Sequence, residues 1–441
     1  MGILRNKRKQ AFAKEICAVL FAMVLPVTIL NGEGTLKVEQ GWPKGKTYDL
    51  KGIKVTLSAP VLVGRSKEYF WYPQIKHLPN GDLVAIIRLG GDTVTADDAV
   101  AMWSRDGGLT WSSPRRFAGQ SWSQLLLPSG DLLLLPFHLY RRPDYTNKEY
   151  VAGVATLIPR GRSEIRQIKD GAKVTGWPRP EGATYRGDPE AERRLGLSSF
   201  CFDGQPLRLK DGRYLTTLYG TFEGAKRFSI VTAESEDGLN WKVRSTIADE
   251  NCKLEGREGP GETTLCRLKD GPLMCVFRPN GGGSGISAFL PYGQTWSQDE
   301  GKTWSEPIAM TDARSVEPRL LVLEDGTVVL SGGRPGLHLW FNIDGTGKAW
   351  QSIDTLKHHN AYQPKEPIQP MERNDVDVDV EHGKYYASRT SAYTEVIVLD
   401  DTNLVYIYDR WASTFPDPPK QAQDAAQSFS IWVVRIALKR N

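Results

Sequence analysis

The chain has 441 residues, with 56 Lys and Arg against 52 Asp and Glu, so its formal net charge is only +4. This near balance, with no long basic run after the N-terminus, argues against nucleic acid as a partner. Thirteen Trp and 43 Gly favour a fold rich in aromatic-packed turns over a helical bundle.

The first 32 residues predict an export signal. The basic string RNKRKQ precedes ICAVLFAMVLPVTIL, an apolar run of 15 residues. Such a run is short for a membrane span and typical of the apolar part of a signal peptide. No A-x-A cleavage site follows and Pro26 interrupts the run, so a short membrane anchor or a wrongly assigned start are the alternatives. We expect an exported protein, secreted or periplasmic, without stable membrane insertion after signal removal.

A hairpin unit recurs along the rest of the chain: an apolar residue, a turn rich in Gly and Asp, and an apolar strand. The six copies are LPNGDLVAIIR (78–88), LPSGDLLLLPF (127–137), LKDGRYLTTLY (209–219), LKDGPLMCVFR (268–278), LEDGTVVLSGGR (323–334) and LDDTNLVYIYD (399–409). Their spacing of about 65 residues allows a four-stranded sheet with loops for each copy. The sequence therefore predicts an all-β fold, a six-bladed β-propeller of four-stranded antiparallel blades over residues 50–441. It would close where residues 53–63 lie beside residues 429–439.

A second repeat is the turn box SRDGGLTW at 104–111, which returns as SEDGLNW (235–241), SQDEGKTW (297–304) and, degenerate, NIDGTGKAW (342–350). We expect these boxes to join the later strands of their blades. Insertions at about 138–200 and 350–385 break the rhythm and are expected to form loops on one face. The Asp/Val alternation at 375–380 is a weak candidate for calcium, but an exposed strand with an acidic face is the preferred interpretation.

Four cysteines follow the signal, and their spacing matches no zinc pattern. Disulfides and buried free thiols are both open for Cys201, Cys252, Cys266 and Cys275. We expect no metal ion and no other cofactor.

The hairpin register predicts a polar ring, because residues equidistant from an antiparallel turn face each other. With the turn glycine as zero (Thr402 in the last copy), position −9 opens the first strand and position +7 closes the second. Position −9 holds Tyr72, Ser121, Asp203, Glu262, Glu317 and Tyr393. Position +7 holds Arg88, Phe137, Tyr219, Arg278, Gly333 (with Arg334 next) and Asp409. In a propeller these ends converge near the axis, whereas solvent-exposed strand ends are the simpler explanation.

The residue types of this ring suggest its chemistry. Three guanidinium groups in one cavity are costly to desolvate unless an anion, such as a carboxylate or phosphate, binds among them. Tyr393 is a poor nucleophile alone, but Glu262 could accept its proton. A neutral nucleophile suits an anionic substrate, which would repel a carboxylate nucleophile.

These residues and boxes resemble the sialidase (neuraminidase) superfamily, whose boxes are called Asp-boxes or BNR repeats. The resemblance covers nearly all of the chain after the signal and places the boxes opposite the active site, in an architectural role. It implies that Tyr393 attacks the anomeric carbon, that Glu262 activates it, and that Arg278 and Arg334 hold a sugar carboxylate. A tyrosine nucleophile is the exception among retaining glycosidases.

The chain departs from that family at two places. Where the family has an arginine opening the first strand, this chain has WYPQI with Trp71 and Tyr72, and we infer that Arg88 substitutes. The acid/base aspartate would lie in GGDTVTADDAV, which offers Asp92, Asp97 and Asp98, and spacing favours Asp97. Asp203 and Glu317 are additional carboxylates that could bind neutral sugar hydroxyls or act as another acid/base pair.

Three functions follow for a protein whose expected partner is a glycan or glycoconjugate. The first is an exported exo-sialidase-like hydrolase that releases a terminal acidic sugar with retention. The second is a propeller hydrolase or lyase acting on a different glycan, and the third is a non-catalytic carbohydrate-binding propeller. The absence of a G-x-S-x-G elbow and of H-E-x-x-H spacing argues against serine hydrolase and zinc protease chemistry.

Overall fold

The computed structural model describes residues 41–90, 98–119, 122–140, 150–160, 164–182, 197–280, 290–314, 316–370, 389–411 and 428–440. Contacts divide the chain into two parts, Met1–Gly41 and Trp42–Asn441, and all the strands described below belong to the second part. Within the described ranges, no helix combines the length and apolarity needed to span a membrane. The expected signal segment and the Asp/Val stretch at 375–380 lie outside these ranges.

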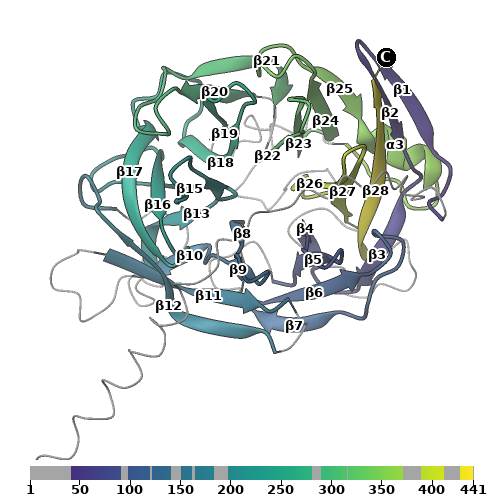
Figure 1. The fold of residues 1–441 in the computed structure, drawn as a ribbon, viewed down its shortest axis with the longest axis horizontal. Helices are drawn as coiled ribbons and strands as arrows, with labels where there is room; N and C mark the ends of the chain where they lie inside the picture. Colours follow the sequence, from purple (N-terminus) through teal and green to yellow (C-terminus); the bar gives the residue numbers. More distant parts are fainter. Residues whose placement is uncertain are drawn as a thin grey trace, which may run out of the picture. The chain divides into compact units, whose positions relative to one another are not determined.

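Nearly all regular structure in the described residues is β-strand, and the sheets are arranged around a common centre (Figure 1). Three sheets have four antiparallel strands, in chain order. The group of strands around each predicted hairpin is called a unit, and the units are numbered in chain order. Unit 1 is β4 (Trp71–His77), β5 (Leu83–Arg88), β6 (Asp98–Ser104) and β7 (Arg115–Ala118). Unit 4 is β18 (Gly259–Arg267), β19 (Leu273–Asn280), β20 (Pro291–Ser297) and β21 (Ile308–Arg314). Unit 5 is β22 (Val316–Val322), β23 (Val328–Gly333), β24 (Leu337–Asn342) and β25 (Gln351–Asp354), followed by the helix α3 (Thr355–Tyr362).

A fourth sheet joins the two ends of the described chain and forms unit 6. Its strands are β1 (Lys46–Leu50), β2 (Ile53–Leu57), β3 (Val61–Ser66), β26 (Glu395–Asp400), β27 (Asn403–Arg410) and β28 (Phe429–Arg440). Both β2 and β3 pair antiparallel with β28. The prediction that residues 53–63 lie beside residues 429–439 is therefore confirmed.

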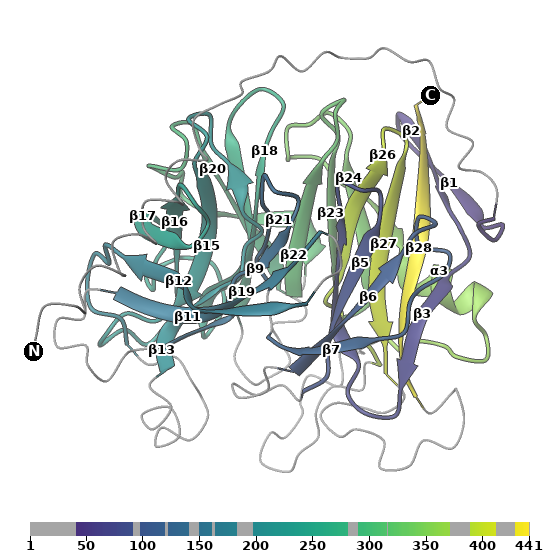
Figure 2. The same cartoon turned by 60° about the horizontal axis from the view of Figure 1, so that its bottom comes forward.

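The remaining ten strands form one sheet that contains two four-strand units. Unit 2 is β8 (Gln124–Leu126), β9 (Leu132–Leu134), β11 (Tyr150–Ile158) and β12 (Arg166–Thr175). Unit 3 is β13 (Leu197–Phe202), β15 (Tyr214–Gly220), β16 (Ser229–Ser235) and β17 (Asn240–Ala248), with β14 (Leu207–Arg208) beside β15. A parallel pairing of β12 with β17 connects the two units (Figure 2). The short β10 (His138–Tyr140), which pairs with β11 and β13, connects them as well. The described parts of residues 138–200 thus supply outer strands as well as loops.

All six predicted hairpins are present as antiparallel pairs. Five of them share one turn, in which the glycine N–H donates to the carbonyl of the apolar residue three positions before it. In the first turn this bond joins Gly81 to Leu78 at 2.9 Å, and Gly81 has φ of +86°. A left-handed residue at this position explains why the pattern requires glycine there. Thr402 occupies the position in the sixth copy, whose turn differs.

The turn boxes join the third and fourth strands of units 1, 3, 4 and 5, as the sequence predicts. In the first box the Ser104 hydroxyl accepts from the Gly108 N–H at 2.8 Å, and the Trp111 indole N–H donates to the Gly108 carbonyl at 3.0 Å. Trp350 and Gly347 repeat the second bond at 3.0 Å. The box is therefore a structural turn that fixes its own tryptophan.

In the part of the chain that the structure describes, buried apolar residues form six clusters, and each contains residues of two neighbouring units. The pairs of units, with one residue from each, are 1 and 2 (Val84, Leu132), 2 and 3 (Leu133, Val231), 3 and 4 (Leu215, Leu273), 4 and 5 (Val276, Leu330), 5 and 6 (Val329, Tyr406), and 6 and 1 (Val405, Ile75). Inner strands are buried on both faces, so they read as continuous apolar runs. All four described cysteines are free thiols, so the thiol alternative holds for them.

Candidate active site

Three residues that open inner strands lie at β-bulges. Tyr72, Glu262 and Glu317 have φ values of +50°, +23° and +40°, and each falls where the register of its hairpin shifts. A bulge turns a side chain away from the direction that regular alternation gives it. A positive φ is costly for a residue other than glycine, so surrounding contacts must hold these backbones.

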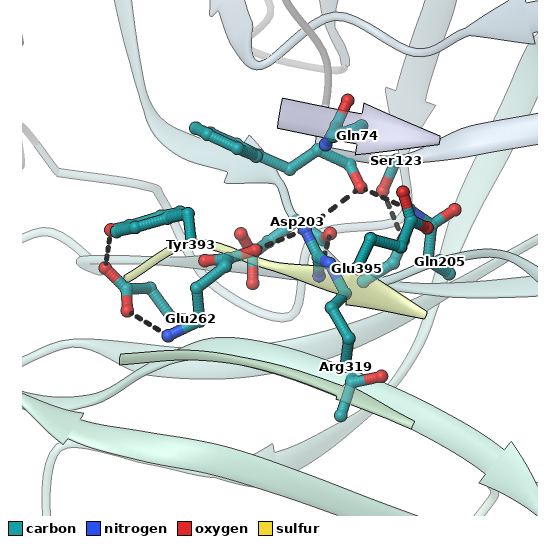
Figure 3. A network of polar contacts seen from close by, with 12 residues as sticks. Gln74, Ser123, Asp203, Gln205, Glu262, Arg319, Tyr393 and Glu395 are labelled. Atoms are coloured by element: carbon teal, nitrogen blue, oxygen red, sulfur yellow. Dashed lines mark hydrogen bonds and ion pairs between the residues drawn. The ribbon is translucent and has the colours of Figure 1, made fainter. Parts of the chain in front are cut away.

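The centre of the candidate site is a contact between Tyr393 and Glu262 (Figure 3). The phenol of Tyr393, next to the start of β26, donates to Oε1 of Glu262 on β18. The Arg278 guanidinium on β19 donates to the same oxygen at 2.7 Å, and the Glu317 N–H donates to Oε2 at 2.9 Å. A partly buried tyrosine of unit 6 therefore meets a buried carboxylate and a buried arginine of unit 4.

Burial and charge set the protonation of this pair. Burial raises the pKa of Glu262, but Arg278, the Tyr393 hydroxyl, the Glu317 N–H and Arg334 together outweigh it and hold that pKa below its ordinary value. Burial and then the charge of Glu262 raise the pKa of Tyr393 well above its ordinary value. At neutral pH the pair is thus an ionised carboxylate hydrogen-bonded to a neutral phenol.

The three predicted arginines are all buried near this pair. Arg88, Arg278 and Arg334 are 5%, 9% and 7% exposed. Arg278 touches Glu262, and the Arg334 charge acts on the same carboxylate. The Arg88 guanidinium lies 5.7 Å from the ring centroid of Tyr72. Arg88 therefore approaches the site through an aromatic neighbour.

Aromatic rings surround the Tyr393 side chain. The Tyr72 ring packs edge-on against it with centroids 4.5 Å apart, and the Trp122 ring lies 5.0 Å away. Tyr72 also stacks on Trp71 at 4.3 Å. The sequence predicted Tyr72 in this ring, but it gave no indication of Trp122, which lies at position −8 of its own hairpin. These rings form an apolar wall beside the phenol.

Asp203 and Glu317 form a second acidic group with Arg319, which the sequence analysis missed. Glu317 is ion-paired with Arg319, and Asp203 accepts from the Thr263 N–H. Arg319 also donates to the carbonyls of Asp203 and Thr263 at 3.5 Å and of Trp122 at 3.4 Å. All three side chains are almost wholly buried. Among the described residues, Asp203 Oδ1 and Glu317 Oε2 have no hydrogen-bond partner.

The pKa values of the two carboxyl groups in this second group are both raised. Burial raises the pKa of Asp203 to about 7, although Arg319 and the Thr263 N–H favour the charged form. Burial also raises the pKa of Glu317 well above its ordinary value, against the charge of Arg319. One cation, Arg319, therefore faces two carboxyl groups. Because their pKa values are raised, Asp203 and Glu317 still hold part of their protons near neutral pH.

We expect Asp203→Asn to stabilise the protein, and to do so more at pH 8 than at pH 5. The pKa of Asp203 is about 7 in the folded protein, against an ordinary value of 3.8. Between about pH 4 and 7, folded Asp203 therefore keeps a proton that the unfolded chain has already released. The associated stability is complete below pH 4 and is lost progressively as pH rises from 4 through 7, so the gain of the variant at pH 8 should exceed its gain at pH 5 by on the order of 3 kcal/mol. Urea unfolding at both pH values measures it.

The control is Asp98→Asn, whose partly exposed carboxylate pairs with Arg116. That substitution should give no gain at pH 8. A stability difference for Asp203→Asn that is the same at pH 5 and pH 8 would contradict the buried titration.

A second ring of polar side chains lies two positions closer to the turns, at position −7. It contains Gln74, Ser123, Gln205, Thr264, Arg319 and Glu395, most of which are labelled in Figure 3. Their bonds cross between units: the Ile75 N–H donates to Glu395 Oε2 at 2.7 Å, and the Leu320 N–H donates to Thr264 Oγ1 at 3.1 Å. Because strand side chains repeat every two residues, the register that gave position −9 could also have found this ring.

Other predicted ring members have different surroundings. Asp409 is fully buried and accepts from the Thr390 hydroxyl at 2.7 Å, the Ser391 N–H at 2.8 Å and the Tyr72 N–H at 3.3 Å. It therefore orders the chain before Tyr393. The acid/base candidates Asp92 and Asp97, and also Ser121, lie outside the described residues, whereas Asp98 pairs with Arg116 on the neighbouring strand β7.

No protein-family model and no curated protein matches the chain. Solved structures do match. A protein of unknown function from Dyadobacter fermentans is 19% identical, with a TM-score of 0.59, over 87% of this chain and 99% of its own. An α-L-arabinofuranosidase from Fusarium graminearum, in complex with an iminosugar inhibitor, is 16% identical, with a TM-score of 0.52, over 89% and 98%.

The Hadza microbial sialidase Hz136 is 12% identical, with a TM-score of 0.51, over 84% of this chain and 66% of its own. At these identities the likeness concerns the fold. The chain therefore has the fold that these two glycosidases share.

Proposed function

We propose that the protein is an exo-acting glycoside hydrolase of sialidase type that releases a terminal acidic sugar with retention. The observation that carries this proposal is the partly buried contact of the Tyr393 hydroxyl with the Glu262 carboxylate, beside Arg278. A phenol on an ionised carboxylate is a nucleophile with its base already in place.

The proposed reaction has two displacements. The Tyr393 oxygen forms a bond to the anomeric carbon while its proton passes to Glu262 and the bond to the leaving oxygen breaks. An aspartate, for which Asp97 and then Asp92 are the candidates, protonates the leaving oxygen. That carboxylate then takes a proton from water, whose oxygen displaces Tyr393, and Glu262 returns the phenolic proton. Because the pKa of Tyr393 is raised, proton transfer and attack occur together.

The arginines support an anionic sugar. Arg278 and Arg334, with Arg88 in place of the missing first arginine, bring three guanidinium groups to the region of Tyr393. A carboxylate on the substrate would accept bidentate bonds from them and offset their mutual repulsion. A neutral phenol as nucleophile does not repel such a substrate.

A second candidate is hydrolysis of a neutral glycan. Tyr72 stands where the resemblance expects a cation, and the buried oxygens Asp203 Oδ1 and Glu317 Oε2 could accept from sugar hydroxyls. The likeness in fold to an arabinofuranosidase is compatible with this alternative.

We also propose that the six units close into a six-bladed β-propeller and that residues 1–32 direct export of the domain at 50–441. The cyclic order of the shared apolar clusters supports the closure, because unit 6 packs on unit 1 as unit 1 does on unit 2. A propeller brings the inner strand ends of all units to one channel.

The test is turnover of an aryl sialoside against a panel of neutral aryl glycosides by the purified protein. Release of the aryl group from the sialoside supports the proposal. Turnover of a neutral glycoside alone favours the second candidate, and glycan binding without any turnover would leave a carbohydrate-binding protein and refute both.

We expect Arg88→Met to raise KM for the sialoside by about 10–100-fold with little change in kcat, because a charged hydrogen bond contributes roughly 1.5–3 kcal/mol. The control is Arg435→Met, an arginine that is 8% exposed and binds Asn403 at the turn end of unit 6. An unchanged KM in Arg88→Met would show that Arg88 does not substitute for the missing arginine.

A further inference from the structure

A groove of about 800 Å³ lies between unit 4 and the turn box of unit 5. Strands β20 and β21 form one side, and the segment 345–350 forms the other. Its volume falls within the range of roughly 300–1,000 Å³ that small-molecule sites occupy. The groove lies apart from Glu262. It includes Asp270, which is in the turn of the β18–β19 hairpin, whereas Glu262 and Arg278 lie toward the end of that hairpin away from the turn. The eight residue steps from Glu262 to Asp270, most of them in strand β18, span roughly 25 Å.

The groove is built from fixed side chains. Gln294, which is 3% exposed, donates from Nε2 to the Gly347 carbonyl at 2.6 Å and so ties unit 4 to the turn of unit 5. The Trp350 indole donates to the same carbonyl at 3.0 Å, and the Gly347 N–H donates to Asn342 Oδ1 at 2.7 Å. Trp350 is therefore held in one orientation before any ligand binds, which lowers the entropic cost of binding.

The lining combines aromatic surface with hydrogen-bonding groups. Trp296 and Trp350 line the groove and are partly exposed, and both pack against the same apolar cluster. Asp270, Glu306 and Gln298 line it as exposed polar side chains. A sugar ring offers an apolar C–H face and a rim of hydroxyls, which match indole faces and carboxylate or amide oxygens respectively.

The charge of the groove selects the kind of sugar. Among the described residues, its lining holds two carboxylates, Asp270 and Glu306, one ammonium, Lys348, and no arginine. Glu306 also pairs with the exposed Lys253 at 3.4 Å. This lining is the opposite of the arginine-rich candidate active site, and an anionic glycan would meet carboxylates here. We propose that this groove is a second carbohydrate-binding site that takes neutral oligosaccharide chains, independent of the reaction at Tyr393.

The experiment is affinity gel electrophoresis of the full chain carrying Tyr393→Phe, so that no probe is consumed. The probes are soluble arabinan, xylan and pullulan, with polysialic acid as the anionic comparison. We expect at least one neutral polymer to retard the protein, and Trp296→Ala and Trp350→Ala each to weaken that binding at least 10-fold. Hydrolysis of aryl glycosides by Trp296→Ala in the wild-type background should stay within twofold.

A matched control exists in unit 1. Trp111→Ala removes a tryptophan that makes the same bond within its box as Trp350 does, but Trp111 does not line the groove, so its loss should leave polymer binding intact. The proposal is overturned if no neutral polymer binds, if only polysialic acid binds, or if the groove variants bind as the parent does. It is also overturned if sedimentation shows a dimer that Ile308→Asp dissociates, since Ile308, 52% exposed in the groove, would then contact a second copy.

Discussion

Tyr393→Phe is expected to lower kcat on the hydrolysed glycoside by about 10³-fold or more, with KM changed little. The substitution removes only the phenolic oxygen, which is the proposed attacking atom, and losses of this size are usual when a nucleophile or its base is removed. Release of the aryl group under saturating substrate measures kcat, and the loss should be equal in kcat and kcat/KM.

The size of this effect follows from the contacts of Glu262. In the variant, Glu262 keeps its bonds to Arg278 and to the Glu317 N–H, so the carboxylate remains paired. The fold should therefore lose only about 1 kcal/mol, the usual contribution of one hydrogen bond. Loss of activity with nearly unchanged thermal unfolding separates a chemical role from a structural one.

The matched control is Tyr408→Phe. Tyr408 is also a buried tyrosine of unit 6, and its hydroxyl bonds to His359 Nδ1 at 2.8 Å rather than to the site. This variant should lose similar stability and keep full activity. If Tyr393→Phe retained more than a tenth of kcat, the tyrosine could not be the nucleophile.

Much of the arrangement could be predicted because the hairpin turns have a recognisable sequence pattern. These turns need a residue with positive φ, as Gly81 shows, so the glycine in the sequence locates the turn of each hairpin. Once the turn is fixed, counting outward places Glu262 beside Arg278, and the structure has them in contact. The pairing of Tyr393 with Glu262 followed from the same counting extended across units.

The parts that could not be predicted depend on bulges and on contacts between units. The bulge at Glu317 directs its N–H to Glu262, and no local pattern marks a bulge in this hairpin. Trp122 was missed because even positions of a regular strand face the other side. Arg319 was missed because a lone arginine in an apolar strand gives no sign that Asp203 of unit 3 lies near it together with Glu317 of its own strand.

Arg319→Met is expected to destabilise the protein by about 3–5 kcal/mol at pH 8, the cost of leaving buried charge without its partner. Arg319, 3% exposed, is ion-paired with Glu317, and its charge opposes the burial that raises the pKa of Asp203. Without it, both carboxylates must hold protons to higher pH in the folded state. The destabilisation relative to the parent should therefore grow as pH rises through 7, where the parent Asp203 ionises near Arg319 while the folded variant must still hold that proton.

The triple variant Asp203→Asn, Glu317→Gln and Arg319→Met tests the cause of that destabilisation. If uncompensated charge is responsible, neutralising all three groups together should recover most of the free energy of unfolding that Arg319→Met loses at pH 8, because a complete buried ion group is worth little net stability. Urea titrations of the single and triple variants at pH 5 and 8 give the comparison. If the triple variant is as unstable as the single one, the loss arises from the donor bonds of Arg319 to the carbonyls of Thr263 and Trp122. In that case the arginine serves mainly to join units 2, 4 and 5, and charge pairing is secondary.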